Sequence, residues 1–150
     1  MELLLVRHGR AGEGATDDSR RLTTTGKTQA CSVGEFLQTI HWTGTDVWHS
    51  SKARARETAE CILESSGLRL VLLERSGLRP EDDVVSCATD IEEIENDLII
   101  VGHNPFMDTI GGYLTQGDLH KSARFFSTGS ALHLKKKGSG KWETLGFFPP

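Results

Sequence analysis

Short apolar runs bounded by polar residues mark the predicted strands of this chain. The two clearest runs, residues 2–6 and 97–101, are rich in Leu, Ile and Val. Continuous runs of this length are typical of strands that are buried on both faces of a parallel sheet. Residues 46–49 and 68–73 form weaker runs, and we expect them to supply a third and a fourth strand.

Apolar residues spaced three and four apart predict helices between these strands. The first helix should begin near residues 23–25, three threonines whose hydroxyl groups can cap a helix start. A short helix should follow Pro105, since proline suits the first helical turn. The apolar positions of the three longer stripes are Ala30, Val33, Leu37 and Ile40; Ala55, Ala59 and Ile62; and Val84, Ala88, Ile91 and Ile94.

The alternation of strands and helices predicts an α/β fold in which helices cover both faces of a mostly parallel sheet. The chain end departs from this alternation, because residues 131–136 and 142–148 flank Gly138-Ser139-Gly140 and predict a C-terminal β-hairpin. Residues 10–21 and 111–129 show no clear period, so we expect long loops there.

Length, composition and charge exclude several classes of protein. The 150 residues can bury one substantial core, so we expect a single domain, 1–150. The net charge of −4 argues against a general nucleic-acid binder, which needs a basic face. The apolar runs are too short to span a bilayer and no secretory signal is evident, so we expect a cytoplasmic protein without membrane contact. Three cysteines without a Cys-x-x-Cys pair favour reduced thiols.

Three chemically active side chains follow predicted strands. His8 follows the first strand, Arg54 comes just after the strand that ends near His49, and His103 follows the strand that ends at Val101. In open α/β sheets, functional sites form beyond the carboxyl ends of the strands. We therefore expect His8, Arg54 and His103 to meet at one edge of the sheet.

Residues of these types can bind and transfer a phosphoryl group. Each guanidinium group, of Arg7 and of Arg54, can donate hydrogen bonds to two phosphate oxygens at once. Arg54 would also lie in the first turn of a helix, where the free backbone N–H groups favour an anion. A neutral His8 is a competent nucleophile, and nearby arginines disfavour its protonated form. A protonated His103 would add another donor to this group of cations, which would stabilise a phosphoryl group in transfer. The scheme needs no metal and no cofactor.

Four motifs, found in order between residues 5 and 105, resemble the histidine phosphatase superfamily. Arg7-His8-Gly9 resembles its signature after the first strand, and Leu22-Thr23-Thr24-Thr25-Gly26 with Gln29-Ala30 resembles its first helix start. Residues 50–60 are similar to its second-arginine helix, and residues 101–105 to its second-histidine turn.

The short length and residues 20–23 and 78–83 resemble the compact SixA-like phosphohistidine phosphatases in particular. The resemblance implies a phosphoglycerate mutase-like fold and a metal-independent phosphatase with His8 as the phosphorylated residue. It also implies that Arg7, Arg54 and His103 bind the phosphate and that Arg20 is a further contact. The substrate it implies is a phosphorylated protein, for example a histidine-containing phosphotransfer domain.

The chain departs from the family pattern at two places. A Ser-Pro pair often precedes the second arginine, whereas Ser50-Ser51 or Ser51-Lys52 stands here. Many members carry a glutamate as proton donor, and for this role Glu81 and Asp83 are candidates by position only. The P–N bond of phosphohistidine is weak, so its leaving group needs an acid less than that of an alkyl phosphate does. Because general acid catalysis contributes about 10²–10⁴-fold, a site without it favours phosphohistidine.

Other interpretations of the same residues remain open. Arg54 could pair with Glu57 or Thr58 on a helix surface, and Arg20 could solvate a loop beside acidic residues 17 and 18. Glu81 and Asp83 could instead stabilise a helix N-terminus. At the level of function, the alternatives are a phosphatase for small phosphomonoesters and a non-catalytic phosphate-binding module.

Overall fold

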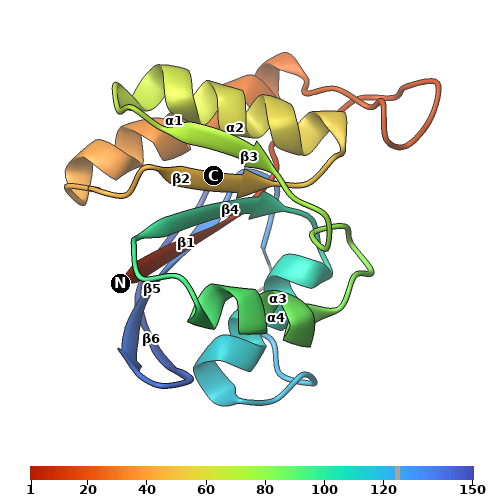
Figure 1. The fold of residues 1–150 in the computed structure, drawn as a ribbon. Coiled ribbons are helices and arrows are strands. Elements are labelled where there is room, and N and C mark those ends of the chain that lie inside the picture. Colours follow the sequence, from red (N-terminus) through yellow and green to blue (C-terminus); the bar gives the residue numbers. More distant parts are fainter. Residues whose placement is uncertain (124–125) are drawn as a thin grey trace.

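Strands and helices alternate along the chain until a hairpin ends it. The structure is a computed structural model and describes residues 1–123 and 126–150. In chain order the elements are β1 Glu2–Arg7, α1 Thr24–Thr39, β2 Asp46–His49, α2 Ala53–Ser66, β3 Val71–Glu74, α3 Val84–Glu92, β4 Leu98–Gly102, α4 Phe106–Gln116, β5 Ala131–Gly138 and β6 Lys141–Phe148 (Figure 1).

A six-stranded mixed sheet in the order β3-β2-β4-β1-β5-β6 forms the centre of the fold. The pairs β1–β4, β2–β4 and β2–β3 are parallel, whereas β5 runs antiparallel to both β1 and β6. The predicted parallel strands and the C-terminal hairpin are therefore confirmed. In the register of the central pairs, Arg7 lies opposite Gly102 and His49 lies opposite Val101.

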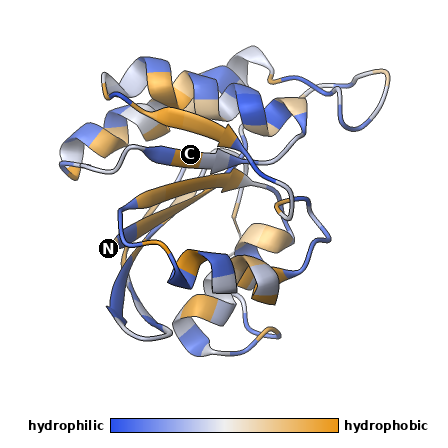
Figure 2. Ribbon diagram, in the orientation of Figure 1, coloured by the Kyte–Doolittle hydropathy of each residue, from blue (hydrophilic) through white to orange (hydrophobic). Residues whose placement is uncertain are grey.

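Two helix layers cover the two faces of the sheet, as the sequence predicts. Helices α1 and α2 lie on one face, and α3 and α4 lie on the other (Figure 1). Leu3 and Leu5 of β1 pack with the α3–α4 layer, whereas Leu4 and Val6 pack with the α1–α2 layer. This burial on both faces explains the continuous apolar runs of β1 and β4, which are strongly hydrophobic in Figure 2. Each such side chain contributes about 1.5–3 kcal/mol when it is fully buried.

The loop predicted for residues 111–129 is wrong at its start, because α4 continues to Gln116. The pair Gly111-Gly112 interrupts the helical pattern in the sequence, although Ile110 and Leu114 continue the buried stripe of the helix. The glycines have a packing reason. A Cβ on Gly112 would lie 1.8 Å from the carbonyl oxygen of Lys121, so the helix needs glycine where that segment crosses it. Residues 124 and 125 of the predicted loop lie outside the described residues.

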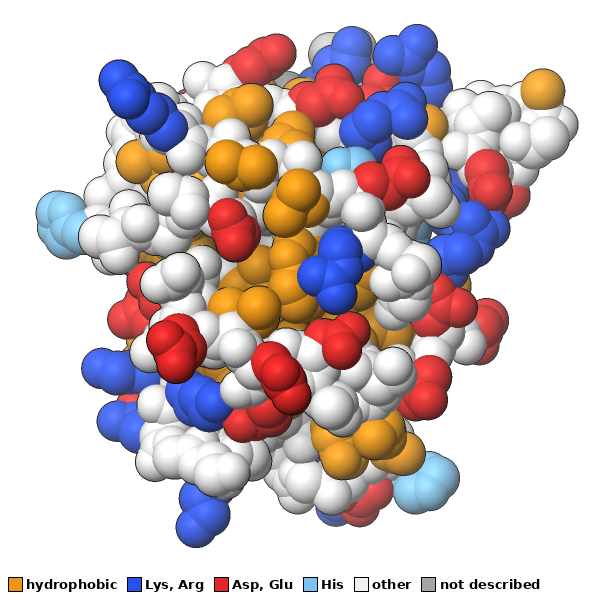
Figure 3. Space-filling model, viewed as in Figure 1, with side chains coloured by type: hydrophobic (Ala, Val, Ile, Leu, Met, Phe, Trp, Pro, Cys, Tyr) orange, Lys and Arg blue, Asp and Glu red, His pale blue; other side chains and the backbone are white. Residues whose placement is uncertain are grey.

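The fourth predicted strand also differs, since β3 begins at Val71 and not at residue 68. Leu70 is buried and Leu68 packs against the same core cluster, so the leucines before the strand serve packing. β3 forms one edge of the sheet, and its side chains Val71 and Leu73 are exposed. Figure 3 shows hydrophobic side chains reaching the surface between the two helix layers. None of the helices in the described ranges is long and apolar enough to cross a membrane.

The start of α1 is held close to the loop that follows β1. Thr23 caps the helix by accepting a hydrogen bond from the backbone of Gly26 at 3.1 Å, as the sequence predicts. A Cβ on Gly26 would lie 2.0 Å from the carbonyl oxygen of Arg10, and one on Gly9 would lie 2.4 Å from that of Gly26. The two glycines therefore let the backbone after His8 pack directly on α1.

We predict that Gly26→Ala destabilises the protein because its Cβ must push two backbone segments apart. Overpacking of this kind costs about 1–3 kcal/mol in free energy of unfolding. The control is Gly146→Ala in β6, where a Cβ would meet nothing within 4 Å. Urea denaturation of both variants checks the prediction, and equal midpoints would contradict it.

Candidate active site

The carboxyl ends of β1, β4 and β2 meet at one edge of the sheet, where a cavity of about 510 Å³ opens. Arg7 ends β1 and His8 follows it, His103 follows β4, and Arg54 is the second residue of α2. The expected meeting of these side chains is thus present in the structure. The residues that line the cavity are Arg7, His8, Arg10, Ala11, Arg20, Gln29, Arg54, Pro80, His103, Asn104 and Thr128.

His8 is buried and held in one orientation by the backbone. Its amide donates to the carbonyl of Gly102 at 2.9 Å, and its Nδ1 lies 2.7 Å from the carbonyl oxygen of Gly9. Because a carbonyl only accepts, Nδ1 must carry the ring proton and Nε2 keeps its lone pair. Burial, with a smaller contribution from Arg54 and Arg7, lowers the pKa of His8 to about 4. The ring is therefore neutral near pH 7.

His103 lies beside His8, with 5.0 Å between the ring centroids. Its Nε2 is 2.5 Å from the hydroxyl oxygen of Ser50, and its Nδ1 is buried without a hydrogen-bond partner among the described residues. Burial lowers the pKa of His103 to about 3, and the neighbouring His8 and Arg54 add to this effect. The condition of a protonated His103 is therefore not met in the free protein, and any hydrogen bond it donates comes from a neutral ring.

Arg7 and Arg54 are each fixed by one side of the guanidinium group. Nη1 of Arg7 donates to the carbonyl of Phe126 at 2.7 Å, and Nη1 of Arg54 donates to that of Asp17 at 2.8 Å. The Nε atoms of both arginines are buried and lack a partner within the described ranges. A buried donor without a partner costs free energy, and an anion in the cavity would satisfy these donors.

The loop between β1 and α1, which projects at the right of Figure 1, carries two acidic side chains that pair with cations near the site. The Asp17 carboxylate contacts Lys52 and Arg54, and Asp18 pairs with Lys52 and Arg79. The hydrogen bond from Lys52 is the main reason why the pKa of Asp17 lies well below its usual range. These carboxylates are not among the residues that line the cavity, and they offset the positive charge of the side chains they contact.

Arg20 lies at the cavity wall, but its hydrogen bonds belong to its own loop. Its Nε donates to the carbonyl of Gly12 at 2.8 Å, and its Nη1 lies 3.3 Å from Asp17. Both sequence interpretations of Arg20 thus have support. Arg54 does not pair with Glu57, which instead binds Arg21 at 2.6 Å.

Carboxylates are absent from the cavity lining within the described part of the chain. Asp83 caps α3 by accepting hydrogen bonds from the backbone of Val85 and Ser86, and Glu81 is exposed. Neither candidate proton donor therefore lines the cavity. Among the described residues, we find no group of three His, Cys, Asp or Glu side chains arranged to hold a metal ion. Metal independence stays a prediction.

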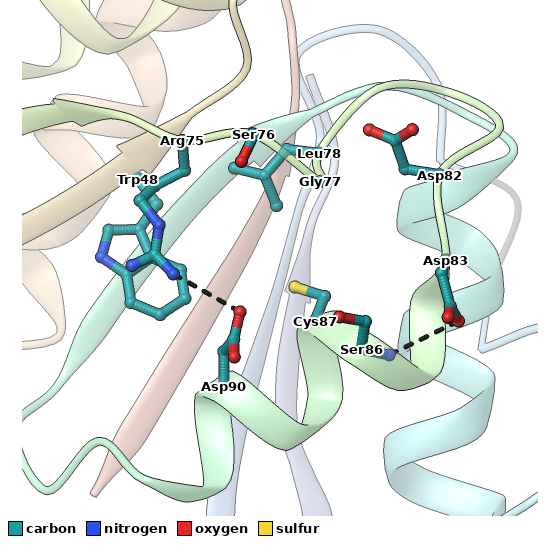
Figure 4. A pocket seen from close by; sticks show the side chains of 10 residues that line it. All are labelled: Trp48, Arg75, Ser76, Gly77, Leu78, Asp82, Asp83, Ser86, Cys87 and Asp90. Atoms are coloured by element: carbon teal, nitrogen blue, oxygen red, sulfur yellow. Dashed lines mark hydrogen bonds and ion pairs between the residues drawn. The ribbon is translucent and has the colours of Figure 1, made fainter.

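A second cavity, of about 310 Å³, lies between the β2 end and α3 (Figure 4). The guanidinium group of Arg75 lies 3.9 Å from the ring centre of Trp48 and pairs with Asp90. Burial raises the pKa of the Cys87 thiol in its wall to about 12, which makes this group a poor nucleophile. The first cavity is thus the better candidate for chemistry.

Three residues that support the site were not assigned a role from the sequence. The Ser50 hydroxyl contacts His103, Asp17 holds Arg54, and the Thr58 hydroxyl accepts from the Gly9 amide at 3.0 Å. Ser50 and Thr58 belong to the motif at residues 50–60, so that motif was the available signal. Asp17 is a loop residue 37 positions from Arg54, and the local sequence pattern gives no signal of their contact.

Comparison with known proteins agrees with this geometry. Residues 3–79 match the family model of the histidine phosphatase superfamily (branch 1). An uncharacterized protein of Picosynechococcus sp. is 32% identical over 145 residues, which cover 92% of this chain and 82% of that protein.

Solved structures share the fold at low sequence identity. The protein histidine phosphatase SixA complexed with tungstate superposes with a TM-score of 0.90 at 21% identity, covering 100% of this chain and 97% of that one. A mycobacterial glucosyl-3-phosphoglycerate phosphatase has a TM-score of 0.73 at 14% identity and covers 99% of each chain. The SixA-like, phosphoglycerate mutase-like architecture expected from the sequence is therefore confirmed at the level of the fold.

We predict that Arg54→Ala weakens the binding of inorganic phosphate. Loss of one charge-assisted hydrogen bond costs about 1.5–3 kcal/mol, which corresponds to a rise in Kd of about 10- to 150-fold. The control is Arg56→Ala, since Arg56 lies two residues further along α2 and pairs with Glu60 at 3.4 Å. Calorimetric titration with phosphate measures both variants. Equal affinities would show that Arg54 does not contact the anion.

The lowered pKa of His8 also predicts how stability depends on pH. Between about pH 6.5 and about pH 4 the unfolded chain binds a proton at His8 that the folded protein does not. The free energy of unfolding therefore falls as the pH falls through this window. His8→Asn, which keeps a donor for the Gly9 carbonyl, should lose less stability than the wild type on acidification. The midpoints of urea denaturation at pH values across this window measure the loss. His120→Asn, at an exposed position, is the control, and identical losses for His8→Asn and the wild type would refute the prediction.

Proposed function

Because the chain belongs to the histidine phosphatase superfamily, we propose that it hydrolyses phosphohistidine on a protein through a covalent phosphohistidine at His8. Membership of this family and the shared fold support a phosphatase in general. The observation that carries the finer proposal is the free Nε2 lone pair of neutral His8, beside His103 and two arginines, in a cavity whose described lining residues include no carboxylate.

In the first step, Nε2 of His8 attacks phosphorus and the P–N bond of the substrate breaks. The substrate imidazole can hold a proton on its other ring nitrogen, so it leaves as a neutral ring that carries that proton. His8 already carries a proton on Nδ1, which the Gly9 carbonyl accepts, so the phosphorylated ring becomes an imidazolium. One phosphorylated imidazolium is exchanged for another, and no group of the site has to donate a proton.

In the second step, water attacks phosphorus and the electrons of the P–N bond return to Nε2. Both protons of the water molecule leave with the product as dihydrogen phosphate, and His8 returns to its neutral form with the proton on Nδ1. In both steps Arg7, Arg54 and His103 would bind the equatorial oxygens, where the charge of a transferring phosphoryl group is spread. Arg20, at the cavity wall, would add a contact to the substrate.

The same account of the protons argues against alkyl phosphates as the best substrates. An alkoxide leaving group needs a proton, and the described cavity lining offers no carboxylic acid to supply it. General acid catalysis is worth about 10²–10⁴-fold, which this site would forgo on such esters. The exposed Arg10 in the cavity wall places the mouth of the cavity at the protein surface, where a protein substrate can approach.

A phosphatase for small phosphomonoesters is the second candidate. It is favoured by the structural similarity to the glucosyl-3-phosphoglycerate phosphatase, whose fold covers 99% of this chain. The turnover of a phosphohistidine protein relative to that of small esters distinguishes the two candidates.

We predict that a phosphorylated histidine-containing phosphotransfer domain is turned over with a kcat/KM at least about 100-fold above that of small alkyl esters. The panel of esters should include a sugar phosphate and an aryl phosphate, whose good leaving group needs no acid. A sugar phosphate that exceeds the phosphoprotein by orders of magnitude would refute the protein-substrate proposal.

The same samples, quenched in alkali, test the covalent step. The wild type should carry an alkali-stable, acid-labile phosphoryl label, whereas His8→Ala should carry none. If the wild type binds phosphate but neither turns over any substrate nor takes up label, the chain is a phosphate-binding module.

A further inference from the structure

The Ser50 hydroxyl is buried against the ring of His103. Ser50 follows β2, has no exposed surface, and places its Oγ 2.5 Å from Nε2 of His103. The same Oγ accepts a hydrogen bond from the backbone of Lys52 at 3.3 Å. In that hydrogen bond Oγ is the acceptor, so the hydroxyl hydrogen is still available to be donated.

The acceptor in contact with this hydrogen is Nε2 of His103. A buried hydroxyl that does not donate loses a hydrogen bond, and Nε2 is the acceptor found beside Oγ among the described residues, so donation from Ser50 into the lone pair of Nε2 is favoured. A neutral imidazole carries one proton, which then has to reside on Nδ1. Nδ1 is buried and lacks a partner among the described residues, so it is the nitrogen left for a ligand.

We propose that Ser50 is a positioning residue that fixes His103 as the Nδ1–H tautomer, so that the ring offers a donor to the anion. The identity of that anion as a phosphoryl group rests on the proposed function. The opposite tautomer would turn a lone pair toward the phosphoryl oxygens, which repel it.

This assignment separates the roles of two identical side chains. The Gly9 carbonyl can only accept, so it leaves His8 with a free lone pair on Nε2. The Ser50 hydroxyl donates, so it leaves His103 with a free N–H on Nδ1. One neutral histidine thus attacks phosphorus, while the other binds an oxygen of the same group. Burial keeps both rings neutral near pH 7, which the division of roles requires.

Nitrogen-15 NMR of the imidazole rings tests the tautomer directly, without any substrate. In the wild type near pH 7.5, His103 should show a protonated Nδ1 and a bare Nε2, with its signals assigned by their loss in His103→Gln. In Ser50→Ala, the proton should shift wholly or partly to Nε2. A proton on Nε2 in the wild type, or an unchanged tautomer in Ser50→Ala, would overturn the proposal even if the protein is not a phosphatase.

Kinetics then test the consequence for turnover. Ser50→Ala should lower kcat by roughly 10- to 100-fold, as is typical when the group that orients a functional histidine is lost. Ser50→Thr keeps the hydroxyl and should recover most of that loss. The control is Ser66→Ala, because Ser66 is also a buried, hydrogen-bonded serine but ends α2 away from the cavity. Equal turnover in Ser50→Ala and Ser66→Ala would contradict the positioning role.

Discussion

The parallel pairing of β1, β4 and β2 is the constraint on which the candidate site depends. Val6 lies opposite Val101, and Val101 lies opposite His49, so the three strands end at the same level. The residues that follow them, among them His8 and His103, therefore emerge side by side. Because side chains alternate between the faces of a sheet, a slip of one residue would turn a whole strand over.

The groups around the cavity share one arrangement, in which the chain binds one polar atom and leaves another unpaired. His8 is held through Nδ1 and His103 through Nε2, whereas Arg7 is held through Nη1 and Arg54 through Nη1 and Nη2, with the Nε atoms of both arginines left unpaired among the described residues. Groups fixed before the ligand arrives need little reorganisation when charge moves during a reaction, which makes them effective electrostatic catalysts. The carboxylate of Asp17 pairs with Arg54 and offsets its positive charge, and Asp17 is not among the residues that line the cavity.

The fold could be predicted from the sequence wherever burial and local helix capping determine it. The apolar runs of β1 and β4 and the cap at Thr23 were predictable, because each depends on neighbouring residues. The length of α4 was not, since its two glycines are explained by a segment that crosses the helix near Lys121.

The sequence was sufficient to predict which histidines and arginines form the site. It was not sufficient to predict the protonation states of the histidines. Strand order brings His8, Arg54 and His103 together, and the motifs name them. The contact between Ser50 and His103 joins residues 53 positions apart, and Asp17 reaches Arg54 from a loop without periodicity. Burial at this edge of the sheet keeps His103 neutral, and the residues next to it in sequence gave no sign of that burial.

The most direct test of the account is a crystal structure of the protein with vanadate, which imitates a phosphoryl group in transfer. The account predicts vanadium within bonding distance of Nε2 of His8, with its oxygens bound by Arg7, Arg54 and Nδ1 of His103. Vanadate bound elsewhere, for example beside Arg75 in the second cavity, with the His8 cavity left without an anion, would contradict it.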